Sequence, residues 1–373
     1  MVDAPHHRWY RLTPDRLVIG LLAAEGLLLL SERFHWFPFN QHKGWTVLMA
    51  VASVGLVAIL MLLWFAASLL FRWRFQYSIR SLLVMVVAVA IPCSWLAVEM
   101  KKAREQKKVI EAVRGLGFID VYDYRIDLGK TPPVPEWLRR LLGDEFFVSV
   151  IALYVTRPPV TDAAMKHVKG LTRLKRLALN GTQLTDAALE HLKGLDQLES
   201  LTLDHTQVTD AGVGHLKGLV QIQLLGLVNT RVTGAGLEHF TRLQSLELNG
   251  SSVTDAGLKH LKGLGQLQWL TLERTKVTDA GLEPLKGLVQ LQRLHLDKTQ
   301  VTDAGLECLK GLTRLEYLSL AYLRVTDSGL GHLQGLNQLR LLNLDNTEVT
   351  DHGVKKLQQT LPNCLIHHWH FQP

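Results

Sequence analysis

One motif recurs through the C-terminal part of the chain and limits what the chain can fold into. A representative copy, residues 184–207, reads LTDAALEHLKGLDQLESLTLDHTQ. The copies follow one another every 24 residues, apart from one interval of 21 residues. They open at Val160, Leu184, Val208, Val232, Val253, Val277, Val301, Val325 and Val349. Such a period is typical of a solenoid, in which each copy is one structural unit stacked on the next.

Each copy contains a short strand followed by a turn. In the segment LESLTL, the alternation of apolar and polar residues predicts a strand with Leu201 and Leu203 pointing inward and Thr202 pointing outward. A small hydroxyl residue follows three positions after the second inward leucine, where it can satisfy backbone groups left between stacked coils. These residues are Thr182, Thr206, Thr230, Ser251, Thr275, Thr299 and Thr347.

The rest of each copy predicts a short helix. In VTDAGVGHLKG, residues 208–218, Thr209 is a candidate N-cap and the charge of Asp210 suits the positive end of a helix. Val213 and Leu216 are three residues apart, so they share the inner helix face. A single copy cannot bury its own apolar residues, and only neighbours on both sides complete the core.

The consensus L-x-x-L-x-L-x-x-T-x-V/L-T-D-A-G-L-x-x-L-K-G resembles the leucine-rich repeat family over residues 148–369. It is most similar to the helical ribonuclease-inhibitor-like and F-box-associated repeats, with Thr where most of the family places Asn or Cys. The resemblance implies an α/β solenoid, a right-handed superhelix with an inner parallel sheet and outer short helices. It also implies a non-enzymatic binding scaffold whose ligands bind the concave face, which is the sheet face away from the helices.

Departures from the motif and the flanking segments predict local changes. The 21-residue copy, residues 232–252, lacks the K-G-L sequence, so its helix is expected to be shorter. Pro284 removes a backbone donor and favours a shorter or 3₁₀-like turn. Residues 109–147 are predicted to form a linker and N-terminal cap, with a strand at 118–126. A helix and a last strand at 364–369 are predicted to form the C-terminal cap.

Residues 1–108 differ in composition from the repeats. They hold 13 Lys and Arg residues against 6 Asp and Glu residues and therefore account for the whole formal charge of +7. This charge flanks apolar segments instead of lining the repeats, so nucleic acid is not predicted as a partner. Three segments, about 17–37, 45–71 and 80–98, are predicted transmembrane helices in a lipid bilayer. The chain therefore looks like a bacterial-type membrane-anchored leucine-rich repeat protein.

The three segments do not support a span equally. Segment 45–71 holds 27 residues without a charge, where a span needs about 20. Segment 80–98 contains Pro92, which membrane helices tolerate. Segment 17–37 contains Glu25 and is typical either of a span or of an interfacial segment. The sequence thus predicts a multi-pass membrane protein with two or three spans. Its Lys and Arg distribution leaves the side of the repeat domain undetermined.

The sequence predicts no catalytic residue, no metal site and no cofactor. It contains no nucleophile elbow, phosphate-binding Gly loop or paired-carboxylate motif. One register repeats a histidine, but equivalent positions on neighbouring coils lie in a row and do not converge on one ion. These histidines are His167, His191, His215, His239, His260 and His332. The terminal His367 and His368 are split by strand alternation.

Candidate binding residues lie on the outward positions of the predicted strands, where the copies vary most. Trp269, Arg293 and Tyr317 occupy one column on consecutive strands. Trp, Arg and Tyr are the side chains enriched in binding hot spots. With the residues that flank them, they define what we call the concave patch: Glu247, Trp269, Glu273, Arg293, His295 and Tyr317. The alternative is that these aromatic side chains simply cover neighbouring leucines.

The function predicted from these features is a membrane-anchored scaffold that binds another protein through its concave face and has no enzymatic activity. One alternative is a membrane enzyme or transporter subunit regulated by its repeats, which would require polar groups converging inside the bilayer. Another is a substrate-selecting adaptor, although no F-box-like segment precedes the repeats. A self-associating surface protein is a further alternative.

Overall fold

The computed structural model describes residues 79–115, 118–122, 136–142, 146, 150–155 and 160–369. The chain divides into two compact units. One comprises residues 1–108 and 123–149, and the other comprises residues 109–122 and 150–373. The segment 109–147, predicted as a linker and N-terminal cap, has residues in both units. Its strand pairs with the first strand of the repeats, which places residues 109–122 in the repeat unit.

The repeat unit is built on a sheet of eleven strands in sequence order. β1 (Phe118–Tyr122) is antiparallel to β2 (Val150–Val155), and β2 to β11 form the parallel sheet that the repeats predict. The remaining strands are β3 (Arg176–Ala178), β4 (Ser200–Thr202), β5 (Leu224–Gly226), β6 (Ser245–Glu247), β7 (Trp269–Thr271), β8 (Arg293–His295), β9 (Tyr317–Ser319), β10 (Leu341–Asn343) and β11 (Leu365–His367).

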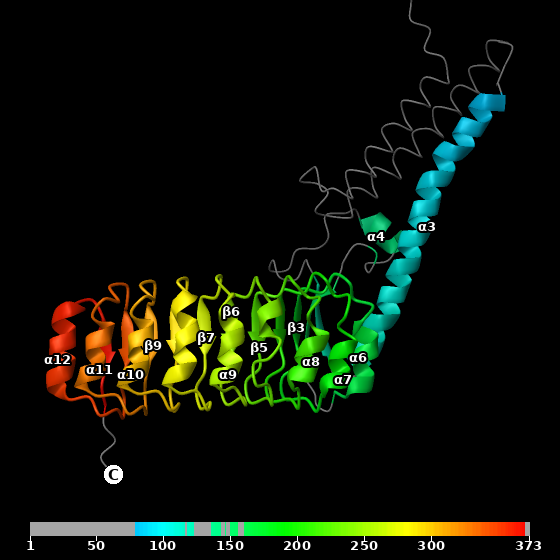
Figure 1. Cartoon of the computed structure of the whole chain (residues 1–373). Helices are drawn as coiled ribbons and strands as arrows, with labels where there is room; N and C mark the ends of the chain where they lie inside the picture. Colours follow the sequence, from blue (N-terminus) through cyan, green and yellow to red (C-terminus); the bar gives the residue numbers. More distant parts are fainter. Residues whose placement is uncertain are drawn as a thin grey trace, which may run out of the picture. The chain divides into compact units, whose positions relative to one another are not determined.

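Short helices return the chain from each strand to the next, and Figure 1 shows them side by side in a row from green to red. The α-helices are α6 (Asp162–Val168), α7 (Asp186–Glu190), α8 (Asp210–His215), α9 (Asp255–Leu258), α10 (Asp303–Leu306), α11 (Asp327–Leu330) and α12 (Asp351–Thr360). The 3₁₀ helices are η2 (Leu237–His239), η3 (Lys259–Leu261), η4 (Asp279–Gly287), η5 (Glu307–Leu309) and η6 (Gly331–Leu333).

The two helix departures expected from the sequence are found. The 21-residue copy has only η2, a single 3₁₀ turn of 3 residues. The copy containing Pro284 is 3₁₀ helix throughout η4, although it is not shorter than its neighbours, since it runs for 9 residues. Proline cannot donate the backbone hydrogen bond of an α-helix, which explains the 3₁₀ form but does not require an early end.

The apolar positions of all copies form one continuous core that runs from Ile110 to Cys364. Within it Leu201 on β4 and Leu203 just after this strand are fully buried, as the alternation predicts, and so is Leu216 on the helix side. Each of the turn hydroxyls donates to the leucine carbonyl three residues earlier at 2.6–2.7 Å, which confirms their predicted role. Leu323, which replaces one of them, is itself buried.

Consecutive coils are joined by a second set of hydrogen bonds that the sequence analysis did not predict. The Asp of each T-D-A motif accepts from the backbone amide of the Thr 23 residues later at 2.7–2.9 Å, and from its hydroxyl at 2.5–2.7 Å. The pairs are Asp162–Thr185, Asp186–Thr209, Asp210–Thr233, Asp255–Thr278, Asp279–Thr302, Asp303–Thr326 and Asp327–Thr350. These bonds from Thr350 lower the pKa of the Asp327 carboxyl.

The 21-residue copy has no Asp–Thr bridge to the copy that follows it, because Gly234 stands where the other copies have Asp. Here the coils approach through their backbones instead. A Cβ atom on Gly257 would lie 1.8 Å from the carbonyl oxygen of Thr233, so only glycine fits at this contact. The shorter copy is thus accommodated by backbone contact in place of a side-chain bridge.

The other unit is described in part. Its long helix α3 (Ile79–Gly115) ends at a glycine, and the last residues of α3 belong to the repeat unit. Phe146 is buried against Trp95, Met100 and Leu142, the last of which ends α4 (Glu136–Leu142).

Among the described residues, no helix combines the length and the apolar composition needed to cross a bilayer. The span predicted at 80–98 stays a prediction. The segments 17–37 and 45–71 lie outside the described residues.

We expect that Asp279→Ala will lower the free energy of unfolding by about 2–3 kcal/mol, because it removes two charge-assisted bonds to Thr302. Asp279→Asn keeps an acceptor for the amide and should lose less. Urea unfolding of the full chain, followed by circular dichroism, measures both. The exposed Asp196→Ala is the control. Equal stability of Asp279→Ala and Asp196→Ala would mean that the bridge contributes nothing.

Candidate functional site

The parallel register brings the predicted column together. Trp269 on β7 pairs with Arg293 on β8, which pairs with Tyr317 on β9. Leu270 is fully buried, so its neighbour Trp269 points to the opposite, concave face of the sheet. The same alternation places His295 on the concave face. The column inferred from the repeat spacing is therefore confirmed.

Side chains of the concave patch contact one another in two groups. The guanidinium carbon of Arg293 lies 5.0 Å from the centroid of the Trp269 ring, a cation–π arrangement. The rings of His295 and Tyr317 are stacked, with centroids 4.6 Å apart and planes 25° apart. His295 Nδ1 is 3.0 Å from Glu273 Oε1. Five of the six predicted residues thus form contacts across three strands.

Glu247 is the sixth residue of the concave patch and lies one strand away. It pairs with Thr271, which in turn pairs with His295, so a threonine separates it from the other five residues. Burial and then the negative charge of Asp204 raise the pKa of Glu247. Burial also raises the pKa of Asp204, although the backbone amide of Val228 donates to it. Glu247 and the nearby Asp204, which lies outside the concave patch, are therefore two carboxyl groups that are partly withdrawn from water.

The aromatic residues have mixed exposure. Arg293 is exposed, while Trp269 and Tyr317 are half-buried. Burial raises the pKa of the Tyr317 hydroxyl. The Trp269 Nε1 atom is buried and has no hydrogen-bond partner among the described residues. The rings therefore cover part of the sheet, as the alternative interpretation expects, and also present surface to a ligand.

A cationic and aromatic rim follows the ends of these strands. Arg274, Lys298 and Tyr322 occupy the same position in consecutive copies, and all three have positive φ angles of 55–61°. Lys298 Nζ lies 4.3 Å from the centroid of the Tyr322 ring. The rim extends the mixture of positive charge and aromatic surface beyond the concave patch.

Sequence reasoning missed the role of Asp297 at this site. Its Oδ1 atom accepts from Ser319 Oγ at 2.5 Å and from the Ala321 amide at 2.7 Å, and Ser319 is almost completely buried. A signal for it was present, since Asn or Asp recurs directly after the second inward leucine of the strand segment. In five copies this side chain holds a backbone amide of the next coil: Asn180, Asp204, Asn249, Asp297 and Asp345.

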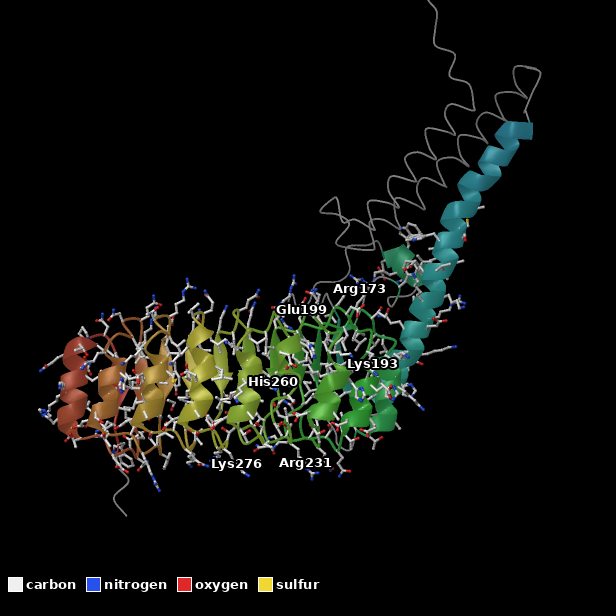
Figure 2. All side chains as sticks on the ribbon, viewed as in Figure 1. Arg173, Lys193, Glu199, Arg231, His260 and Lys276 are labelled. Atoms are coloured by element: carbon white, nitrogen blue, oxygen red, sulfur yellow. The ribbon has the colours of Figure 1, made fainter. Side chains whose placement is uncertain are left out.

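The histidines that repeat on the helix side lie away from the concave patch. His260 is on the helix-bearing face in Figure 2, and its Nδ1 atom is 2.9 Å from Glu238 Oε2. At the end of the sheet His367 is exposed, whereas His368 packs with its Nε2 atom 2.8 Å from the Val349 carbonyl oxygen. This is the separation that strand alternation predicts for the two terminal histidines.

Comparisons with known proteins support the leucine-rich repeat resemblance. The leucine-rich repeat family matches residues 289–349. No curated protein sequence matches the chain. Similar solved structures include internalin C2 from Listeria monocytogenes, at 25% identity, covering 56% of this chain and 84% of that chain with a TM-score of 0.44. The parallel sheet with its short return helices fits a leucine-rich repeat solenoid, a class suited to protein–protein interaction. The ribonuclease-inhibitor-like subtype stays a prediction.

Two further solved structures are similar. A leucine-rich repeat protein of Leptospira interrogans has 20% identity, a TM-score of 0.45 and coverage of 54% of this chain and 56% of that chain. Internalin InlF from Listeria monocytogenes has 18% identity, a TM-score of 0.35 and coverage of 63% of this chain and 88% of that chain.

We expect Glu247→Gln to stabilise the protein at pH 7. The raised pKa of Glu247 means that folding favours its protonated form, so its contribution to stability falls as pH rises above its ordinary value of 4.5. Glutamine removes this penalty, raising the thermal midpoint at pH 7 by about 2 °C, with the gain vanishing below pH ~4. Glu283→Gln is the control, because a hydrogen bond from Lys286 lowers the pKa of Glu283. A destabilised Glu247→Gln at pH 7 would contradict the expectation.

Proposed function

We propose that this protein is a membrane-anchored, non-enzymatic scaffold that binds a protein partner through the concave patch. The observation that carries the proposal is the contact between unlike side chains on consecutive strands. Arg293 lies over Trp269, and Tyr317 stacks on His295. The outward residues of the strands differ from copy to copy. Stability alone does not require these differences, since it comes from inward leucines and from bonds between coils.

The physical properties of the concave patch suit a protein ligand. Trp, Tyr and Arg supply large contact areas with few rotatable bonds, and they dominate the energetics of many interfaces. Their strands are held on both sides by the parallel sheet, so little order has to be gained on binding. The concave patch and its rim carry charges of both signs, positive at Arg274 and Arg293 and negative at Glu247. This favours a partner with complementary charges of both signs.

The membrane anchor rests on the sequence of residues 1–108. The strongest support is the segment of 27 uncharged residues at 45–71, flanked by Arg72 and Arg74. The apolar segment 17–37 would add another span. We propose that these segments hold the protein in the lipid bilayer as a multi-pass protein. The repeat domain would then be presented on one side of the membrane.

The variant Trp269→Ala/Tyr317→Ala is expected to lose its partner in a pull-down from detergent extract. Truncating two aromatic anchors costs about 2–4 kcal/mol, a loss of at least ~30-fold in affinity. Trp369→Ala is the matched control, because Trp369 is an exposed tryptophan that follows the last strand. Circular dichroism verifies that the variants fold. If the double variant retrieves the same proteins as wild type, the concave patch does not bind them.

The anchor predicts that the full chain stays in the membrane pellet after extraction with alkaline carbonate. Release into the supernatant would rule out an integral protein. Protease treatment of intact cells then assigns the side of the repeats through a C-terminal epitope. Loss of the epitope implies an outer location and an odd number of spans, whereas protection until lysis implies two spans and an inner location.

A further inference from the structure

We propose that Glu273, His295 and Asp297 form a binding site for a divalent transition-metal ion of the Zn²⁺ type. Each residue offers one ligand atom, and these atoms all lie within 4.8 Å of one another. In the part of the chain that the structure describes, this is the one group of three or more His, Cys, Asp and Glu side chains with such convergence. The proposal concerns the free protein and goes beyond partner binding.

The distances fit an ion after small side-chain rotations. His295 Nδ1 is 3.0 Å from Glu273 Oε1 and 4.0 Å from Asp297 Oδ2. Tetrahedral ligands with bonds of about 2.0–2.1 Å lie about 3.3 Å apart, which falls between these two separations. His295 ends β8, and Glu273 and Asp297 lie two residues beyond β7 and β8, so the sheet holds the backbone close to all three side chains.

Neighbouring residues orient two of the three ligands. Asp297 Oδ1 is occupied by the Ser319 hydroxyl and the Ala321 amide, which leaves Oδ2 on the side of His295. Tyr317 stacks on the His295 ring and limits its rotation. Outer partners of this kind fix the orientation of ligating carboxylates and imidazoles in metal sites.

Thr271 is a second, independent sign of a ligand at this place. It is only 5% exposed, and its Oγ1 atom is buried without a hydrogen-bond partner among the described residues. It pairs with His295 in the sheet, and the buried Leu270 before it in the pleat directs Thr271 toward the same concave face. An unpaired buried hydroxyl costs free energy, and a ligand such as a metal-bound water supplies the missing partner.

Glu273 is also a departure from the repeat consensus. At the position of Glu273, five other copies carry Asn or Asp, as at Asn249 and Asp297, whose side chains hold the next coil's backbone amide, and two carry Val228 and Ala321. The longer Glu273 side chain instead extends to His295. A position that serves the scaffold elsewhere thus contributes a carboxylate to the site here.

The ligand set selects the class of ion. Imidazole suits Zn²⁺ and similar transition metals, whereas Mg²⁺ and Ca²⁺ prefer oxygen ligands alone. Two carboxylates balance the charge of a divalent ion, and three protein ligands leave one position of a tetrahedral ion for water or a ligand group. The competing explanation is a simple ion pair between Glu273 and protonated His295, which needs no metal.

Calorimetric titration of the full-length chain in detergent, freed of metal by a chelator, tests the proposal with Zn²⁺. We expect one site per chain that becomes at least ~100-fold weaker in His295→Ala and Asp297→Ala. Ser319→Ala should weaken it by about 10-fold, because it removes only an orienting bond. His260→Ala on the helix side and His205→Ala at a strand end are matched controls that leave the site intact. Cobalt absorption in place of Zn²⁺ reports the ligand geometry.

Two outcomes would overturn the proposal. One is an absence of stoichiometric Zn²⁺ binding to wild type. The other is Zn²⁺ binding that persists unchanged in His295→Ala but falls in His260→Ala, which would assign the ion to the helix-side histidines. Glu273→Gln keeps the side-chain volume and serves if His295→Ala fails to fold. Because no partner is present in this titration, its result is separate from that of the pull-down.

Discussion

The structure depends on the fact that a single coil cannot bury its own leucines. Each coil is completed by its neighbours, and three sets of contacts hold that stacking in register. The parallel strands pair residue by residue, the turn hydroxyls satisfy leucine carbonyls, and Asp side chains bind the Thr of the next coil. Every one of these contacts recurs at a fixed position, so the whole scaffold follows from one repeated motif.

This regularity frees the outward positions of the strands for other purposes. Leu270 and Leu294 are locked in the core, but the residues beside them contribute little to the stacking and can differ from copy to copy. Because the strands are short and rigidly paired, such differences produce a surface with defined side-chain contacts. The raised pKa of Glu247 fits this difference between inward and outward positions. A carboxylate in a partly buried position reduces stability at neutral pH, so function explains its presence better than stability does.

The sequence predicted what depends on local periodicity. Inward leucines, the role of Thr206, the 3₁₀ form around Pro284 and the column from Trp269 to Tyr317 all follow from spacing alone. It did not predict the Asp–Thr bridges, because the bonded residues are 23 positions apart and each also has a sufficient local explanation at a helix N-terminus. The division of residues 109–147 between two units likewise depends on a pairing between distant strands.

The periodic residues of this sequence did not predict a metal site. Histidines that repeat once per coil form a row, and a row cannot surround an ion. Convergence requires the opposite pattern, in which neighbouring coils carry different residues. Glu273 lies two residues beyond β7, while His295 ends β8 and Asp297 lies two residues beyond it. The parallel pairing of β7 with β8 therefore brings the three side chains together. A departure from the consensus was therefore a better indicator of chemistry than the most regular histidine pattern in the sequence.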